Sequence, residues 1–234
     1  MILVISNIAI EAAPALVNLF PTGAASLVTA SDFYTSFRAG ISVNGFSSSA
    51  LCINGKEIKP GDISGVITTV PCFLPVEFYY VDPADRQYVC TEVNSFFLYF
   101  LSELKCKKCN GPDWRMFVSG LTHKPELAKT AFKLGIPVQP FTIMNGYQEP
   151  ADNKPDELKK CTIIYDKIID AGGSEEMARY TRQLAGALSV PYLDCFFSLS
   201  NDKEYLLAQI NTIPDISAPE NRQAIANHFL NAAL

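Results

Sequence analysis

The sequence predicts an α/β protein in which a mainly parallel sheet with helices is followed by a smaller α+β part. Short, fully apolar runs such as 1–6 and 62–70 have the character of buried parallel strands, which lack polar alternation. Amphipathic helices lie between these runs, as in strand–helix–strand units. After residue 190 the order changes, because a tight loop separates two strands and one helix follows them.

The composition is that of a folded, mildly acidic chain. Its 234 residues are 48% hydrophobic and 18% charged, with a formal net charge of −5. That length allows one sizeable core or two small lobes. Nucleic acid is not expected as a partner, because no basic stripe could neutralise phosphates. The Lys-rich runs KCKK and ELKKC are short and are explained as solvated helix ends.

The cysteines and the first residues favour a cytoplasmic protein. The chain has seven cysteines, and the CxxC of Cys106 and Cys109 has no second pair at zinc-ribbon spacing. We therefore expect reduced, structural thiols. The apolar first ten residues have no basic region or cleavage site and are interpreted as a strand, not a signal peptide. No membrane is expected as a partner, because no apolar run is long enough to span one.

Residues 1–143 are predicted to form the first domain. The expected elements are, in order, a strand at 1–6, a helix from Pro14 to about Phe20, a strand at 25–30, an antiparallel meander with turns at Asn44-Gly45 and Asn54-Gly55, a strand at 62–70, a helix at 92–104, a strand at 115–119 and a helix from about Thr122 to Gly135. The helices are indicated by a proline in the first turn, a wide apolar stripe or a glycine stop. Asn-Gly pairs are hairpin signals.

Residues 144–234 are predicted to form the second part. Its start, 144–175, is polar and punctuated by proline at first, and we expect a linker or lid remnant there, with one strand in CTIIYDKII. Ser174 is a sound helix N-cap, since two glutamates follow it. The runs YLDCFFSL and EYLLAQIN flank the four-residue loop SNDK, and the capping box SAPE begins a C-terminal helix.

Three polar residues stand out on this apolar hairpin. If SNDK closes it symmetrically, Asp194 faces Gln209, and Asn211 lies two residues further on the same side. One interpretation is that the three side chains hydrogen-bond to each other and to the backbone. The other is a metal and phosphate site, although one carboxylate and two amides make a poor magnesium cage.

A Tyr-rich segment, FYYVDPADRQYV, is surrounded by the acidic residues Glu77, Asp82, Asp85 and Glu92. Tyrosine and arginine favour protein interfaces, so this segment is a candidate partner-binding edge. A turn with half-buried tyrosines explains it equally well.

Two stretches together resemble the ATP-grasp ligases, in particular the RimK-like branch that modifies peptides. The run DISGVITTVP … YVCTEVNSFFLYFLSEL … KCNGPDWRMFVSGLTHKPELAKTAFKLGIPVQPFTI is similar to the domain that precedes their catalytic part. The tail LAGALSVPYLDCFFSLSNDKEYLLAQINTIPDI … IANHFLNAAL resembles the end of the ATP-grasp domain. The resemblance implies a pre-ATP-grasp domain at 1–143 and a truncated ATP-grasp part at 144–234.

The resemblance also assigns site positions. Asp194 takes the acidic strand position and Asn211 the position of the metal-binding asparagine, while Gln209 stands where the metal-binding glutamate is expected. The family's lid subdomain, which holds the nucleotide, is represented here only by about 144–175. Lys167 is the candidate phosphate contact in that remnant.

These departures favour a degenerate, non-catalytic protein that binds a peptide, a carrier or a partner ligase and needs no cofactor. The alternative is an ATP-dependent carboxylate–amine ligase with an atypical or partner-completed site. It would use ATP and Mg²⁺, with Asp194 and Asn211 as metal ligands and Lys167 on the phosphates. A third option is a different small ligand in a cleft between lobes. We also expect a homodimer, because a sheet edge left bare by a missing lid needs covering.

Overall fold

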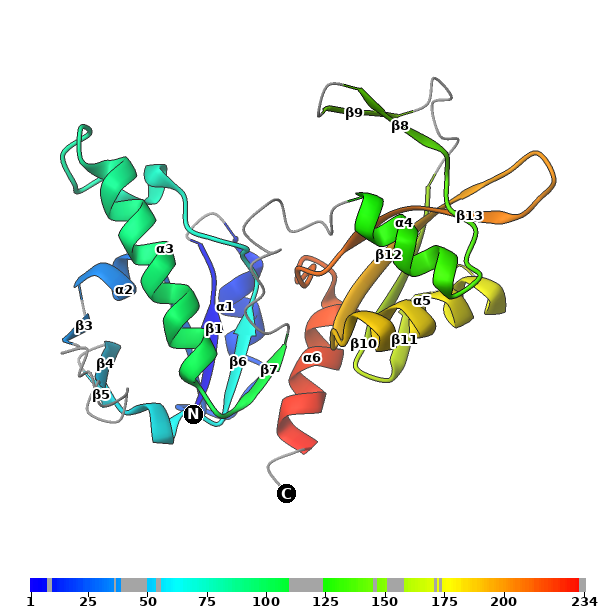
Figure 1. Cartoon of the computed structure of the whole chain (residues 1–234). Coiled ribbons are helices and arrows are strands. Elements are labelled where there is room, and N and C mark those ends of the chain that lie inside the picture. The colour runs from blue at the N-terminus through cyan, green and yellow to red at the C-terminus, as the bar shows by residue number, and fades with distance from the viewer. Residues whose placement is uncertain are drawn as a thin grey trace. The chain divides into compact units, whose positions relative to one another are not determined.

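The computed structural model describes residues 1–7, 10–35, 37–38, 50–53, 56–109, 124–144, 147–150, 158–170, 172 and 174–231. Contacts divide the chain into two compact units, drawn in Figure 1. The first unit consists of Met1–Phe117 and Ile213–Leu234, and the second of Val118–Thr212. The expected boundary between the sequence domains 1–143 and 144–234 stays a prediction.

The first unit contains the predicted parallel sheet. Its strand order is β2-β1-β6-β7, and every neighbouring pair is parallel. The strands are β1 (Ile2–Ile5), β2 (Ala25–Val28), β6 (Gly65–Thr68) and β7 (Lys107–Cys109). The interior strands β1 and β6 are buried along their whole length, which explains their unbroken apolar character. The strand expected at 115–119 lies outside the described residues.

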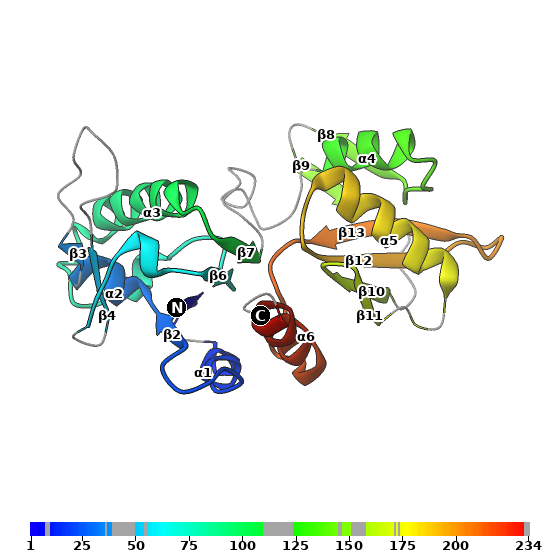
Figure 2. The same cartoon turned by 90° about the horizontal axis from the view of Figure 1, so that it is seen from below.

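Two helices of this unit start earlier than the sequence predicts, α6 (Pro219–Asn231) begins in the predicted capping box, and α2 (Ala30–Thr35) was not predicted. The two that start early are α1 (Ala12–Val17) and α3 (Arg86–Glu103), and the unit also has short 3₁₀ turns η2 (Pro60–Asp62) and η3 (Pro75–Phe78). Helix α1 begins two residues before Pro14, and α3 begins six residues before the expected position 92. Helix α3 covers one face of the sheet, and α1 and α6 lie on the other (Figure 2).

The expected meander forms a separate antiparallel sheet. Its strands are β3 (Phe37–Arg38), β4 (Ala50–Ile53) and β5 (Lys56–Ile58), in that order. The predicted turn at Asn54-Gly55 falls between the paired strands β4 and β5, although the turn residues, like Asn44-Gly45, lie outside the described residues.

The second unit is built on an antiparallel sheet with the strand order β11-β10-β12-β13. These strands are β10 (Lys159–Ile164), β11 (Lys167–Asp170), β12 (Tyr192–Leu199) and β13 (Tyr205–Asn211). Helices α4 (Lys124–Lys133) and α5 (Glu175–Leu188) lie on the same face of this sheet (Figure 2). A separate hairpin consists of β8 (Phe141–Met144) and β9 (Tyr147–Pro150).

Two expectations for this unit need correction. Residues 159–170, expected within a linker or lid remnant with one strand, form two strands, and β10 lies inside the sheet. The run ELKKC, interpreted as a solvated helix end, leads into β10. The helix start at Ser174 is confirmed, because its side chain accepts a hydrogen bond from the Met177 amide at 3.3 Å.

Candidate functional site

The predicted polar residues lie on the terminal hairpin with a different register from the one expected. Asp194 faces Asn211, not Gln209, and Gln209 faces Phe196. The loop occupies 200–204 and is thus one residue longer than expected. The pairing also shifts between Phe196 and Phe197, which leaves Ala208 as an extra bulge residue in β13.

The bulge keeps the three polar residues on one face. Leu207 and Ile210 pair with Phe197 and Cys195, and all four belong to the core beneath α4 and α5. Facing residues in a sheet project to the same side, and successive residues alternate. Asp194, Gln209 and Asn211 therefore project from the opposite face, as the sequence predicted.

Asp194 is the centre of a hydrogen-bonded group that spans two strands. Only 1% of its surface is exposed. The Thr162 hydroxyl donates to Oδ1 at 2.6 Å, and the Tyr192 hydroxyl donates to Oδ2 at 2.8 Å. The Lys160 ammonium lies 3.3 Å from Oδ2. Both carboxylate oxygens are thus engaged by donors from β10 and β12.

Burial dominates the electrostatics of this carboxyl group. It raises the pKa of Asp194, while the hydrogen bond from Thr162, the charge of Lys160 and the hydrogen bond from Tyr192 act in the opposite direction. A bound divalent cation would do the reverse and hold the carboxylate ionised. Lys160 already supplies a counter-charge to Asp194.

The residues at this site do not fit a magnesium ion. Magnesium takes hard oxygen ligands, mostly carboxylates and water. Here the predicted ligands comprise one carboxylate, already paired with an ammonium group, and the amides of Gln209 and Asn211. Across the described part of the chain, no group of three His, Cys, Asp or Glu residues is placed to hold a metal ion.

Lys167 lies elsewhere on the sheet. It begins the edge strand β11, pairs with Ile164 and is exposed. The cation that meets Asp194 is Lys160, which the sequence interpretation missed together with Thr162 and Tyr192. A signal was present, since Lys160 and Thr162 alternate at the period of a strand, but the lysine pair was assigned to a helix end.

The carboxyl edge of the parallel sheet is a second candidate site. The chain leaves β1 toward β2 on one side, and β6 and β7 follow on the other, which makes a topological switch point between β1 and β6. Ser6, Thr68 and Thr69 are buried at this edge. Thr69 donates to the Ile5 carbonyl at 3.2 Å, whereas no partner within the described residues is recorded for the Thr68 hydroxyl. Such edges commonly bind small ligands, and the sequence interpretation missed this one.

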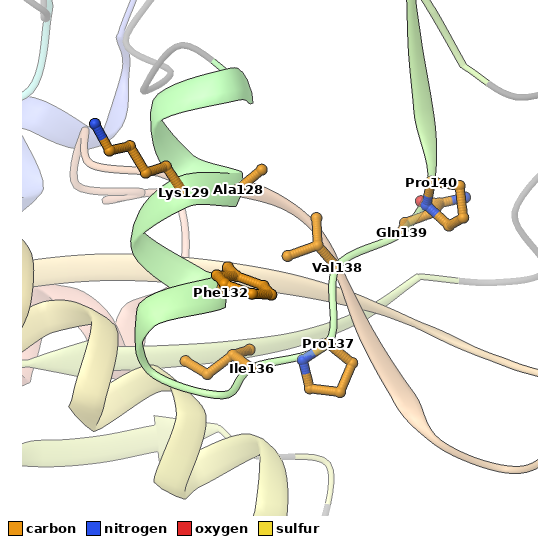
Figure 3. Close-up of a pocket in the computed structure, with 8 residues that line it drawn as sticks. All are labelled: Ala128, Lys129, Phe132, Ile136, Pro137, Val138, Gln139 and Pro140. Atoms are coloured by element: carbon orange, nitrogen blue, oxygen red, sulfur yellow. The ribbon is translucent and has the colours of Figure 1, made fainter.

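An apolar groove of about 580 Å³ lies beside α4 in the second unit. In Figure 3, Phe132, Ile136 and Val138 border the groove, and Lys129 points away from it. Residues 137–139 are held against β13 by two backbone hydrogen bonds. The Gln139 N–H donates to the Leu207 carbonyl at 2.9 Å, and the Leu207 N–H donates to the Pro137 carbonyl at 2.8 Å. Phe132 is 84% exposed, so the groove can accept an apolar side chain.

The thiols give no sign of reactivity. None of the six cysteines whose side chains are described forms a disulfide, and Cys109 of the CxxC is buried. Burial raises the pKa of the Cys109 thiol to about 12, so it stays protonated and poorly nucleophilic. No helix among the described residues has the length and apolar character to cross a bilayer.

Comparisons with known proteins identify the fold. No family model matches the sequence, and no curated protein matches it. Solved structures do match. The macrocyclase MdnC bound with precursor peptide MdnA, from Microcystis aeruginosa, superimposes with a TM-score of 0.75 at 13% identity, covering 99% of this chain and 100% of that one.

Two further structures agree. A Chryseobacterium gregarium RiPP-associated ATP-grasp ligase, in complex with ADP and a leader and core peptide, has a TM-score of 0.67 at 13% identity, covering 100% of this chain and 97% of that one. A RimK domain ATP-grasp protein from Sphaerobacter thermophilus has a TM-score of 0.54 at 8% identity, covering 98% and 99%. These likenesses confirm the predicted fold class and the predicted resemblance.

Proposed function

We propose that this chain, which has the ATP-grasp fold, is a non-catalytic protein that binds a peptide. The fold is that of ligases whose structures hold precursor, leader or core peptides. Structural neighbours that share this architecture therefore bind peptides. A carrier or a partner ligase is a related ligand, and a cytoplasmic location stays a prediction from the sequence.

The observation that carries the non-catalytic assignment is the state of Asp194. Phosphoryl transfer from ATP requires metal ligands together with cations on the phosphates. Asp194 is the one carboxylate of the predicted metal site, and Thr162, Tyr192 and Lys160 occupy both of its oxygens. A metal would compete with these donors for the Asp194 oxygens and would find an amide at Gln209.

The alternative function is a carboxylate–amine ligase whose site a partner completes. Its support is Lys160, a partly exposed cation on the same face as Asp194, and the nucleotide in one neighbour's structure. In that case ATP and Mg²⁺ are cofactors, Asp194 and Asn211 are metal ligands, and Lys167 contacts the phosphates.

Thermal unfolding with and without Mg²⁺ and ATP separates the two. A ligand at about a hundred times its dissociation constant stabilises a protein by about 2.7 kcal/mol. We expect no magnesium-dependent shift for the wild-type chain at millimolar ATP. A clear shift that requires both ATP and magnesium would reject the non-catalytic assignment.

The variant Gln209→Glu adds the missing carboxylate and sharpens this test. If the site is a relic of a metal site, the variant should gain magnesium binding that the wild type lacks. Gln87→Glu, on the exposed surface of α3, adds the same charge at a position distant in sequence from Gln209 and serves as the control. An equal response of both variants would show only a general charge effect.

A further inference from the structure

Exposed large hydrophobic side chains are concentrated in one short stretch of the first unit. Seven such residues are found among the described residues, and five of them fall between positions 74 and 88. The five, here called the aromatic surface, are Leu74 (50% exposed), Val76 (70%), Tyr79 (67%), Tyr80 (38%) and Tyr88 (68%). The other two, Phe132 and Leu199, belong to the second unit. Clustered exposed apolar side chains, unlike scattered ones, indicate a binding surface.

The backbone that carries the aromatic surface is held by side chains of α3. The Asn94 amide group pairs with both the N–H and the C=O of Phe73, at 2.8 and 2.9 Å. The Arg86 guanidinium donates to the carbonyls of Tyr79 and Val81, at 2.8 and 3.0 Å. The segment is thus ordered over the start of α3 (Figure 1). A pre-ordered surface loses little conformational entropy when a partner binds.

A buried anchor lies under the same segment. Phe78 of η3 is fully buried and belongs to the core of the first unit, whereas Tyr79 and Tyr80 beside it are exposed. The rings of Tyr79 and Tyr80 are edge to face, with centroids 5.3 Å apart. The two exposed rings therefore form one contact area and not two independent side chains.

The surroundings of the aromatic surface are acidic. Residues 74–92 contain four carboxylates, Glu77, Asp82, Asp85 and Glu92, and one basic side chain, Arg86. Asp82, Asp85 and Glu92 are exposed, while the Arg86 guanidinium is directed to backbone carbonyls. The exposed charge that a partner meets is therefore negative.

We propose that the aromatic surface docks a basic segment of a partner polypeptide, in which lysine or arginine lies next to aromatic or aliphatic side chains. Tyrosine faces attract ammonium and guanidinium groups, and the carboxylates add attraction from the rim. The inference rests on the proposed function in that the ligand is a peptide. The surface lies in the first unit and Asp194 in the second, so variants can test them separately.

The test is a selection of random displayed dodecapeptides on the full-length chain, run in parallel on the variant Tyr79→Ser/Tyr88→Ser. Both tyrosines are exposed, so the variant should fold, and its thermal unfolding checks that it does. We expect the wild type to enrich peptides of net positive charge with aromatic or aliphatic residues. The double variant should not enrich them.

The enriched peptide is then synthesised with a fluorescent label, and its affinity is measured by anisotropy. We expect the double variant to lose at least about tenfold in affinity, as for central aromatic residues of interfaces. Leu199→Ser, an exposed hydrophobic residue of the second unit, should bind like the wild type. Asp85→Asn/Glu92→Gln should weaken binding and flatten its salt dependence.

Each remaining outcome contradicts the inference. Enriched peptides that are acidic or neutral, or that bind the double variant unchanged, would overturn it and leave the proposed function intact. No enriched peptide at all would overturn both. A wild-type dimer that the double variant converts to monomer would show that a second copy of the chain, and not a basic partner, covers the surface.

Discussion

Asp194 connects the sequence pattern to the proposed function, because its surroundings decide which role a carboxylate has there. It lies in the first half of β12, a strand whose other buried side chains are mostly apolar. Donors from Thr162, Tyr192 and Lys160 compensate its burial. These contacts make Asp194 a connection between strands β10 and β12, with its oxygens already in use.

The first prediction follows from that role. Asp194→Ala leaves two hydroxyls and an ammonium group without their acceptor, and we expect it to lower the free energy of unfolding by about 2–4 kcal/mol. Denaturant unfolding monitored by circular dichroism measures the change. Asp202→Ala, in the exposed hairpin loop, should stay within about 0.5 kcal/mol of the wild type. Equal stabilities of the two variants would refute a structural role.

The second prediction concerns pH. Burial raises the pKa of Asp194 above its ordinary value of 3.8, so the folded protein holds this proton more tightly than the unfolded chain. The stabilisation that the Asp194 carboxyl contributes to the folded state is complete below pH 3.8. It is lost as the pH rises through the pKa that this group has in the folded protein. The stability of the wild type relative to Asp194→Asn should therefore fall with pH in this window. A relative stability that rises with pH would mean that the ion pair with Lys160 outweighs burial.

The grouping of the polar residues could be predicted from the sequence, and their pairing could not. Residues two apart in a strand share a face, which placed Gln209 with Asn211. The cross-strand partner of Asp194 depends on the loop length and on the bulge at Ala208, and neither has a clear sequence signal. Lys160 was missed because a lysine pair near a strand start also suits a helix end.

At the scale of elements, the buried apolar strands were easier to predict than the polar edge strand β7. The apolar runs at β1, β2 and β6 could only be buried strands or helix segments, and their length favours strands. Strand β7 has two lysines among its three residues and is fixed by pairing with β6, a contact distant in sequence. Helix α2 was missed for a different reason, since its start has a local signal, Asp32 accepting from the Thr29 amide at 2.7 Å, that the sequence interpretation overlooked.

Gly65 in β6 leaves room for a side chain of helix α6. A Cβ atom there would lie 2.5 Å from Cε1 of Phe229, whose ring is buried. We expect Gly65→Ala to destabilise the chain by about 1–3 kcal/mol through overpacking, as measured by thermal unfolding.

Two further variants check that this contact is the cause. Gly61→Ala introduces a methyl group into open space and should be nearly neutral. Adding Phe229→Leu to Gly65→Ala should recover part of the loss, because the smaller side chain makes room. Strictly additive losses would show that Gly65 and Phe229 are not coupled.

At the scale of the whole molecule, the linear order of elements predicted the α/β class, with a parallel sheet followed by an antiparallel hairpin. It could not predict that α6, the last element, returns to the first unit. The capping box marks where α6 begins, but the apolar stripe on a helix does not say which sheet it covers. That choice is made by tertiary packing, here by Phe229 against Gly65.

The expected homodimer is a prediction at this scale. Residues 137–139 already pair with β13 at one edge of the second sheet, while β11 forms the other edge. Exposed strand edges are sites of association. Light scattering of the purified chain should give twice the mass of one chain, and a monomer at high concentration would contradict the prediction.

The most direct test of the non-catalytic assignment is isothermal titration calorimetry of Mg²⁺–ATP into the full-length chain. Because Asp194 is already engaged by three donors and Gln209 offers no charge, we expect no saturable heat at millimolar nucleotide. Saturable, magnesium-dependent binding that Asp194→Asn abolishes would contradict the account and identify an active nucleotide site.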